Sequence, residues 1–317
     1  MLFKKKIVKL FFLFCLSFVA IPMVKAEDNV TVILDWFLNA SHESLLAAEY
    51  SGAFKRHGLN VDLIAPADPG SPPRLLAAGQ ADLAISYPLQ LGLLVDQHIQ
   101  LVQVGFLLDH PLETLITQKE IKTIQHLKGK TIGVSAAGDE SLILEAMLEH
   151  NGLKLSDLHF IVVNFQLEQA LITGAVDAII GASRNYELID LQQRHYPVSV
   201  FFPEQNGAPI YDGLIFVAQK KAANQPKLAR FMQALKEGSD YLQAHPDEVY
   251  QKAIHDHPEL GTPLNKAAWN ATLPLVAKNP ASVDKNKMRE LLHFLLEKKA
   301  IQHMYPMENY IYEIHSP

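Results

Sequence analysis

Cysteine is almost absent from this 317-residue sequence, and its one occurrence, Cys15, falls within the first 26 residues. Those residues are predicted to be a secretory signal peptide, because lysines precede an apolar run from Leu10 to Ala20 and Ala26 ends a small-residue cleavage site. The run is shorter than the roughly 20 residues that a membrane-spanning helix needs. Bulky Phe14 before Cys15 disfavours a lipoprotein signal. Cleavage would leave no disulfide or thiolate chemistry, which favours a bacterial periplasm for an exported chain.

Positive charge is also scarce. The sequence has 28 lysines and arginines against 34 aspartates and glutamates. Cleavage after residue 26 would remove five lysines and no acidic residue, leaving 23 basic against 34 acidic residues and a formal net charge of −11. An acidic surface disfavours nucleic acid and an anionic membrane as partners.

Several chemical signatures are missing. The sequence has no Gly-x-Ser-x-Gly motif of a serine hydrolase, and no Walker-type lysine follows the proline-rich segment 66–74. The 14 histidines are scattered, with His255 and His257 as the closest pair, and they form no His-x-x-x-His or His-Glu-x-x-His motif. We therefore expect neither a metal site nor serine-hydrolase activity.

What the sequence does have is a regular alternation of short apolar strands and helices. A strand at 31–34 precedes a helix at 44–56, which Gly58 terminates, and a strand at 60–64 follows. Such alternation predicts parallel sheets joined by crossover helices. Further strands are expected at 83–86, 131–134 and 213–218, and further helices at 89–97, 226–244, 246–255, 266–275 and 284–299.

An internal repeat predicts two such units. Residues 74–86 read "RLLAAGQADLAIS" and residues 170–182 read "ALITGAVDAIIGA", each a short helix, a Gly-x-x-Asp turn and a small strand. The segment 128–153 likewise repeats the plan of 31–58. We expect a cleaved peptide at 1–26, a first lobe built from 27–108 and 213–317, and a second lobe at 109–212. The chain would then cross between the lobes twice.

This plan resembles the periplasmic solute-binding proteins of ABC transporters, in the two-lobe class called type II. Each lobe there is a mostly parallel sheet flanked by helices. The segments "DWFLNASH" at 35–42 and "NYEL" at 185–188 resemble the branch that binds thiamine pyrimidine precursors, hydroxymethylpyrimidine or formylaminopyrimidine. The resemblance implies a monomeric periplasmic protein without a cofactor or an enzymatic activity. It would capture a small planar pyrimidine and deliver it to an ABC transporter permease.

Two other functions compete with this interpretation. One is capture of a different solute, such as a riboflavin precursor, a sulfonate or nitrate, but anions favour basic residues and only Arg74 and Arg184 lie in the candidate loops. The other is the related fungal hydroxymethylpyrimidine synthase, which consumes pyridoxal phosphate and its own histidine. No lysine for a Schiff base occurs between Lys55 and Lys119. The region that corresponds to the enzyme's cysteine-rich iron-binding stretch reads "IIGASRNYEL", without sulfur.

Candidate ligand-binding residues follow the predicted strands, because open α/β sheets bind ligands beyond the carboxyl ends of their strands. Aromatic rings suited to stack on a flat heterocycle are Trp36, Tyr87 and Tyr186. Tyr211, at the second crossover, either lines the cleft or packs at the hinge. The backbone amides of 135–141 offer another polar contact, with Asp139 or Glu140 as the alternative helix cap.

Polar candidates occupy the same loops. Asn39 and His42 are expected to bond ring nitrogens or a hydroxymethyl group, and Asn185 is expected to add amide contacts. Glu187 is expected to accept from an exocyclic amine, a charge-assisted bond worth about 1.5–3 kcal/mol. Structural roles remain open: Asn39 as a turn residue, His42 as a helix cap, and Glu187 at the positive end of a helix dipole. For Asp35 a turn role and a ligand contact are equally expected.

Overall fold

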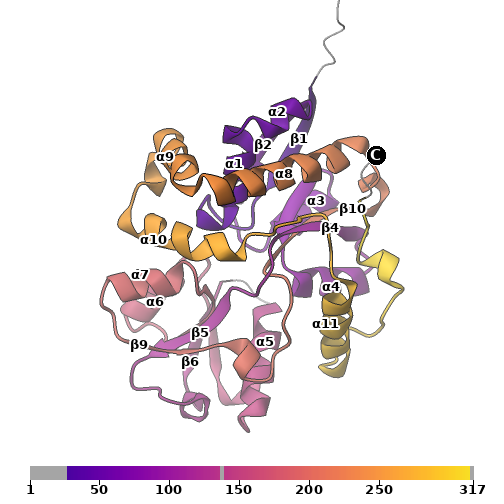
Figure 1. Cartoon of the computed structure of the whole chain (residues 1–317). Helices are drawn as coiled ribbons and strands as arrows, with labels where there is room; N and C mark the ends of the chain where they lie inside the picture. Colours follow the sequence, from indigo (N-terminus) through magenta and orange to yellow (C-terminus); the bar gives the residue numbers. More distant parts are fainter. Residues whose placement is uncertain (1–26, 136–138, 315–317) are drawn as a thin grey trace, which may run out of the picture.

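The computed structural model describes residues 27–135 and 139–314, and the predicted signal peptide lies outside them (Figure 1). Two five-stranded sheets form the two lobes. Lobe one has the order β2 (Leu59–Ile64), β1 (Asp28–Ile33), β3 (Leu83–Ser86), β10 (Leu214–Gln219) and β4 (Leu101–Leu108). Lobe two has the order β7 (His159–Val162), β6 (Thr131–Val134), β8 (Ala178–Ser183), β5 (Glu113–Gln118) and β9 (Val198–Phe201).

The two sheets share one pattern, which confirms the predicted two-lobe α/β fold. In lobe one β1 is parallel to β2 and β3, and β10 is antiparallel to both β3 and β4. In lobe two β6 is parallel to β7 and β8, and β5 is antiparallel to β8 and β9. Four strands in each sheet therefore share one direction. The opposed strand is in each case the one that the chain enters directly from the other lobe.

Helices cover both sheets, with lobe one above lobe two in Figure 1. Within lobe one α8 packs along α1, and α10 reaches lobe two, where it contacts α7. The α-helices are α1 (Glu43–Tyr50), α2 (Ala53–Arg56), α3 (Pro72–Ala77), α4 (Pro88–Asp96), α5 (Asp139–His150), α6 (Leu167–Ile172), α7 (Glu187–Gln193), α8 (Pro226–Ala244), α9 (Pro246–Asp256), α10 (Pro263–Thr272) and α11 (Lys285–Glu297). Among the described residues no helix combines the length and apolar character needed to cross a bilayer.

The long helix α8 packs closely on α1. Leu228, Phe231 and Leu235 recur at helical spacing and are buried against lobe one. At Gly238 a Cβ atom would lie 2.5 Å from the Cβ of Ala48, so only glycine allows this approach of the two helices. Helix α8 thus supports α1 from one side, and the loop that follows β1 leads into the N-terminal end of α1.

Two predicted helices differ from the structure. The helix expected at 44–56 is wrong as one element, since α1 ends at Tyr50 and α2 begins at Ala53. Gly52 adopts φ +74 between them, a left-handed conformation that breaks the helix. The helix expected at 266–275 begins earlier, at Pro263, because the Thr262 side chain accepts the Asn265 N–H and caps it.

Candidate ligand-binding site

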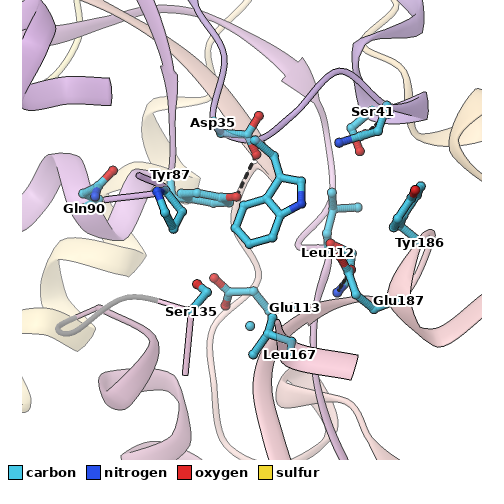
Figure 2. Close-up of a pocket in the computed structure, with 15 residues that line it drawn as sticks. Asp35, Ser41, Tyr87, Gln90, Leu112, Glu113, Ser135, Leu167, Tyr186 and Glu187 are labelled. Carbon is cyan, nitrogen blue, oxygen red and sulfur yellow. Dashed lines mark hydrogen bonds between the residues drawn. The ribbon is translucent and has the colours of Figure 1, made fainter. Parts of the chain in front are cut away.

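A cavity lies between the lobes, where the carboxyl ends of the parallel strands meet (Figure 2). About 790 Å³ of space not filled by atoms lies here, counting the opening to solvent. Lobe one contributes Asp35, Trp36, Asn39, Ser41, Pro69, Tyr87 and Gln90. The first crossover and lobe two contribute Leu112, Glu113, Ser135, Leu167, Gly181, Ser183, Tyr186 and Glu187.

Asp35, which the sequence left undecided, is buried in this wall and held by two side chains. The Tyr87 hydroxyl donates to Asp35 Oδ2 at 2.8 Å, as Figure 2 shows. His42 Nε2 lies 2.9 Å from Asp35 Oδ1, and the Asn39 backbone N–H donates to His42 Nδ1 at 3.2 Å. Because Nδ1 accepts, the imidazole is the neutral tautomer that donates from Nε2. His42 is fully buried and does not line the cavity, so its place is to orient Asp35.

Asn39 lines the cavity, but both ends of its amide are used inside its own loop. Its Oδ1 accepts the Ser41 N–H at 2.8 Å, and its Nδ2 donates to the Phe37 carbonyl at 2.9 Å. These bonds shape the turn between β1 and α1, which is the structural alternative that the sequence allowed. The turn fixes Asp35 and Trp36 at the cavity.

Trp36 belongs to a group of four aromatic rings that joins the lobes. Its ring meets Phe165 of lobe two edge-on, with centroids 4.3 Å apart. Phe37 lies 6.4 Å from Phe165 and 5.9 Å from Tyr186, again between ring centroids. Trp36 Nε1 is buried and has no hydrogen-bond partner among the described residues. Trp36, which lines the cavity, thus carries an N–H donor without a described partner.

Two further carboxylates reach the cavity from lobe two. Glu187, the first residue of α7, is buried, and its Oε2 accepts the Ser183 N–H at 2.7 Å. Burial raises its pKa above the usual range, and the charge of Asp35 across the cavity acts in the same direction. Glu113, the first residue of β5, accepts at Oε2 from the Tyr211 hydroxyl at 2.8 Å. Tyr211 itself is buried and does not line the cavity, so it contacts Glu113 from outside the lining.

Asn185 is the third predicted residue that does not line the cavity. Its Nδ2 donates to Thr272 Oγ1 at 2.7 Å and to Ser41 Oγ at 3.2 Å, so it bonds lobe two to lobe one. Its Oδ1 is buried and has no partner among the described residues. Asn185 therefore takes part in the contact between the lobes.

Basic side chains stay out of the cavity. Of the described residues that line it, none is lysine, arginine or histidine. Arg184, a candidate for an anion contact, donates instead to both oxygens of Glu204, at 2.9 and 3.0 Å. The predicted backbone site at 135–141 lies outside the described residues except for Ser135 and the backbone of 139–141. No group of three or more potential metal ligands occurs in the described parts of the chain.

Phe165, Glu113 and Ser41 are among the residues at or beside the cavity that the sequence reasoning missed. Phe165 lies after β7 as Trp36 lies after β1, so the rule used for the other strand exits would have found it. Glu113 begins a strand instead of ending one. It reaches the cavity because β5 runs antiparallel to β8, which places Glu113 opposite Ser183.

Solved structures share this arrangement. The alkanesulfonate-binding protein SsuA of Xanthomonas axonopodis, bound to MOPS, matches with a TM-score of 0.69 and 16% identity over 88% of this chain and 96% of that one. At that identity the likeness concerns the fold alone. Two mixed sheets with a cavity between them define the fold as that of the two-lobe periplasmic binding proteins. The chain belongs to the NMT1/THI5-like family, whose model matches residues 39–249.

Three relatives with different names match most of this chain. A putative thiamine biosynthesis protein of Haemophilus influenzae is 40% identical over 91% of this chain and 93% of its own. A formylaminopyrimidine-binding protein of Halalkalibacterium halodurans is 29% identical over 80% and 78%. A 4-amino-5-hydroxymethyl-2-methylpyrimidine phosphate synthase of Aspergillus parasiticus is 24% identical over 82% and 80%.

Proposed function

We propose that this protein captures a thiamine pyrimidine precursor, hydroxymethylpyrimidine or formylaminopyrimidine, for an ABC importer. It binds the ring as a periplasmic monomer, makes and breaks no bond, and hands the ring to a permease. The observation that carries the proposal is that aromatic rings and carboxylates converge on one cavity from both lobes: Trp36, Tyr87 and Tyr186 with Asp35, Glu113 and Glu187.

An aminopyrimidine matches these groups in shape and in hydrogen bonding. Its flat ring offers two faces to aromatic side chains, each pair worth about 0.5–1.5 kcal/mol beyond the area buried. Its exocyclic amine donates to carboxylates, and its ring nitrogens accept from donors such as Trp36 Nε1. The relative named as a formylaminopyrimidine-binding protein supports the same class of ligand.

Sulfonate or nitrate capture is the alternative that the structural neighbours raise, and the charge of the cavity argues against it. An oxyanion requires cationic or N–H-rich surroundings to replace its water. Three carboxylates line this cavity, and the nearby Arg184 is paired with Glu204. A flat uncharged solute such as a riboflavin precursor is the remaining alternative within the binding-protein class.

A synthase reaction is the alternative that some relatives raise. It would need an amine for pyridoxal phosphate, and no described lining residue is a lysine. It would also need a reactive histidine, whereas both nitrogens of the buried His42 are engaged, by Asp35 and by the Asn39 N–H. These observations support binding without catalysis.

Isothermal calorimetry with the purified protein tests the proposal. We expect tight binding of hydroxymethylpyrimidine or formylaminopyrimidine, weaker binding of thiamine, and none of taurine or nitrate. Preferential binding of taurine, nitrate or a riboflavin precursor would refute the ligand assignment. Incubation with pyridoxal phosphate and iron should leave the protein mass unchanged. A decrease in mass that corresponds to a consumed histidine would show that the protein is a synthase.

A further inference from the structure

The three carboxylates of the cavity come from opposite lobes. Asp35 follows β1 of lobe one, whereas Glu113 and Glu187 begin β5 and α7 of lobe two (Figure 2). All three belong to the same cavity lining, and two of them, Asp35 and Glu187, are buried while the lobes are in contact. Closing the lobes therefore brings negative charge from both sides into one desolvated space.

Several hydrogen-bond donors to these carboxylates are uncharged groups. Asp35 accepts from the neutral His42 and from Tyr87, Glu113 accepts from Tyr211, and Glu187 accepts from a backbone N–H. No lysine, arginine or histidine is found among the described lining residues. Burial is the main cause of the raised pKa of Glu187, and the charge of Asp35 in the other lobe adds to it. Like charges in a cavity of low dielectric repel far more strongly than in water.

Neutral contacts between the lobes act in the opposite direction. Asn185 bonds to Thr272 and Ser41, and Phe165 packs against Trp36. These contacts stabilise the closed arrangement, whereas the negative charge of the three carboxylates in the cavity destabilises it. A ligand shifts the equilibrium between open and closed lobes only if its affinity for the two states differs. The chemistry of a ligand bound among the carboxylates therefore determines whether the lobes close.

We propose that Asp35, Glu113 and Glu187 make closure of the lobes depend on a ligand that brings hydrogen-bond donors or positive charge, and that they exclude the phosphate ester of the same ligand. This inference rests on the proposed function for the identity of the ring. An amine or a protonated ring nitrogen compensates the carboxylates when it is buried with them. A phosphate monoester, with a charge of about −1.5 to −2 near neutral pH, adds to the repulsion instead.

Spin-label distances across the cleft test the charge effect without any ligand. Residues 27–317 contain no cysteine, so Gln169→Cys in lobe two and Glu259→Cys in lobe one, both exposed, give one defined pair of labels. We expect the ligand-free closed population to rise at least about threefold in Asp35→Asn, Glu113→Gln and Glu187→Gln. Glu297→Gln, an exposed carboxylate on α11, is the matched control and should leave the distances unchanged. An unchanged distance distribution in all three cavity variants, with normal melting curves, would overturn the proposal.

Calorimetry with hydroxymethylpyrimidine and its phosphate ester tests the exclusion. We expect the wild-type protein to prefer the alcohol by at least about a hundredfold and Glu113→Gln or Glu187→Gln to reduce that preference about tenfold. Equal affinity of the wild-type protein for the alcohol and the ester would overturn the exclusion. If neither compound binds, the proposed function fails, and the ligand-free distances still decide whether the carboxylates oppose closure.

Discussion

Asn185 of lobe two donates a hydrogen bond of 2.7 Å to Thr272 Oγ1 of lobe one, and the same amide reaches Ser41 Oγ at 3.2 Å. Thr272 in turn donates to the Ala268 carbonyl within α10, so it is held as an acceptor for Asn185. The bond joins the loop before α7 to the end of α10. It exists only while the lobes are together, which separates its effect on closure from any effect on the fold of either lobe.

Replacing Asn185 with alanine should therefore weaken ligand binding without lowering stability much. A net contribution of about 0.5–1.5 kcal/mol for each hydrogen bond corresponds to an affinity loss of about tenfold for the pair. Calorimetry with hydroxymethylpyrimidine measures this loss. Gln193→Ala, which removes only an exposed bond of 3.1 Å to the Pro263 carbonyl, should change the affinity much less. Equal affinities for Asn185→Ala and the wild-type protein would show that the bond does not contribute to closure.

Phe165 should contribute to binding although it does not line the cavity. Its edge-on contact with Trp36, at 4.3 Å between centroids, closes the aromatic group across the lobes. Phe165→Ala removes a contact worth about 0.5–1.5 kcal/mol beyond its buried area, and we expect the affinity to fall at least about tenfold, mainly through faster dissociation. Stopped-flow fluorescence of Trp36 measures the rate. Phe160→Ala, an exposed phenylalanine of the same lobe, should bind normally; a similar loss there would point to a general defect of lobe two.

The ring and the N–H of Trp36 can be separated by substitution. Trp36→Ala should weaken pyrimidine binding at least about tenfold, because it removes both the stacking surface and the donor. Trp36→Phe keeps a ring but removes Nε1, which is buried and has no partner among the described residues. If Nε1 donates to the ligand, Trp36→Phe should lose a part of the affinity that Trp36→Ala loses. Binding as tight as that of the wild-type protein in both variants would remove Trp36 from the site.

The sequence predicted the edge of the sheets at which the cavity lies, because that edge follows from the order of strands and loops alone. Trp36, Asn39, Tyr87, Tyr186 and Glu187 all line the cavity for this reason. That these residues contact a ligand stays a prediction. Their position at one cavity follows from the topology alone.

The remaining part of the site depends on contacts between distant segments, which local patterns do not contain. Whether Asn185 faces the cavity or α10 depends on where Thr272 lies, 87 residues further along the chain. The pairing of Tyr211 with Glu113 joins residues 98 positions apart, one at the start of β5 and one at the second crossover. His42 looked like a ligand donor because its loop is polar, and only the position of Asp35 shows that both its nitrogens are used internally.

The stability of lobe two should fall as the pH rises from about 4.5 to about 8. Burial, followed by the charges of Glu187 and Asp190, raises the pKa of Glu168 from 4.5 to about 8. Between these values the unfolded chain releases the Glu168 proton while the folded protein keeps it, so unfolding becomes more favourable with each pH unit. Above both values the carboxylate is ionised in either state and the effect is complete.

Glu168→Gln keeps the shape of the side chain and removes this titration. The variant and the wild-type protein should be equally stable near pH 4, and the variant should be more stable at pH 8, by about 2 kcal/mol after allowance for solvent screening. Urea unfolding at the two pH values measures the difference. Glu120→Gln, an exposed glutamate of the same lobe, should follow the wild-type protein at both. A Glu168→Gln variant that loses stability with pH as steeply as the wild-type protein would show that Glu168 is already ionised in the folded state.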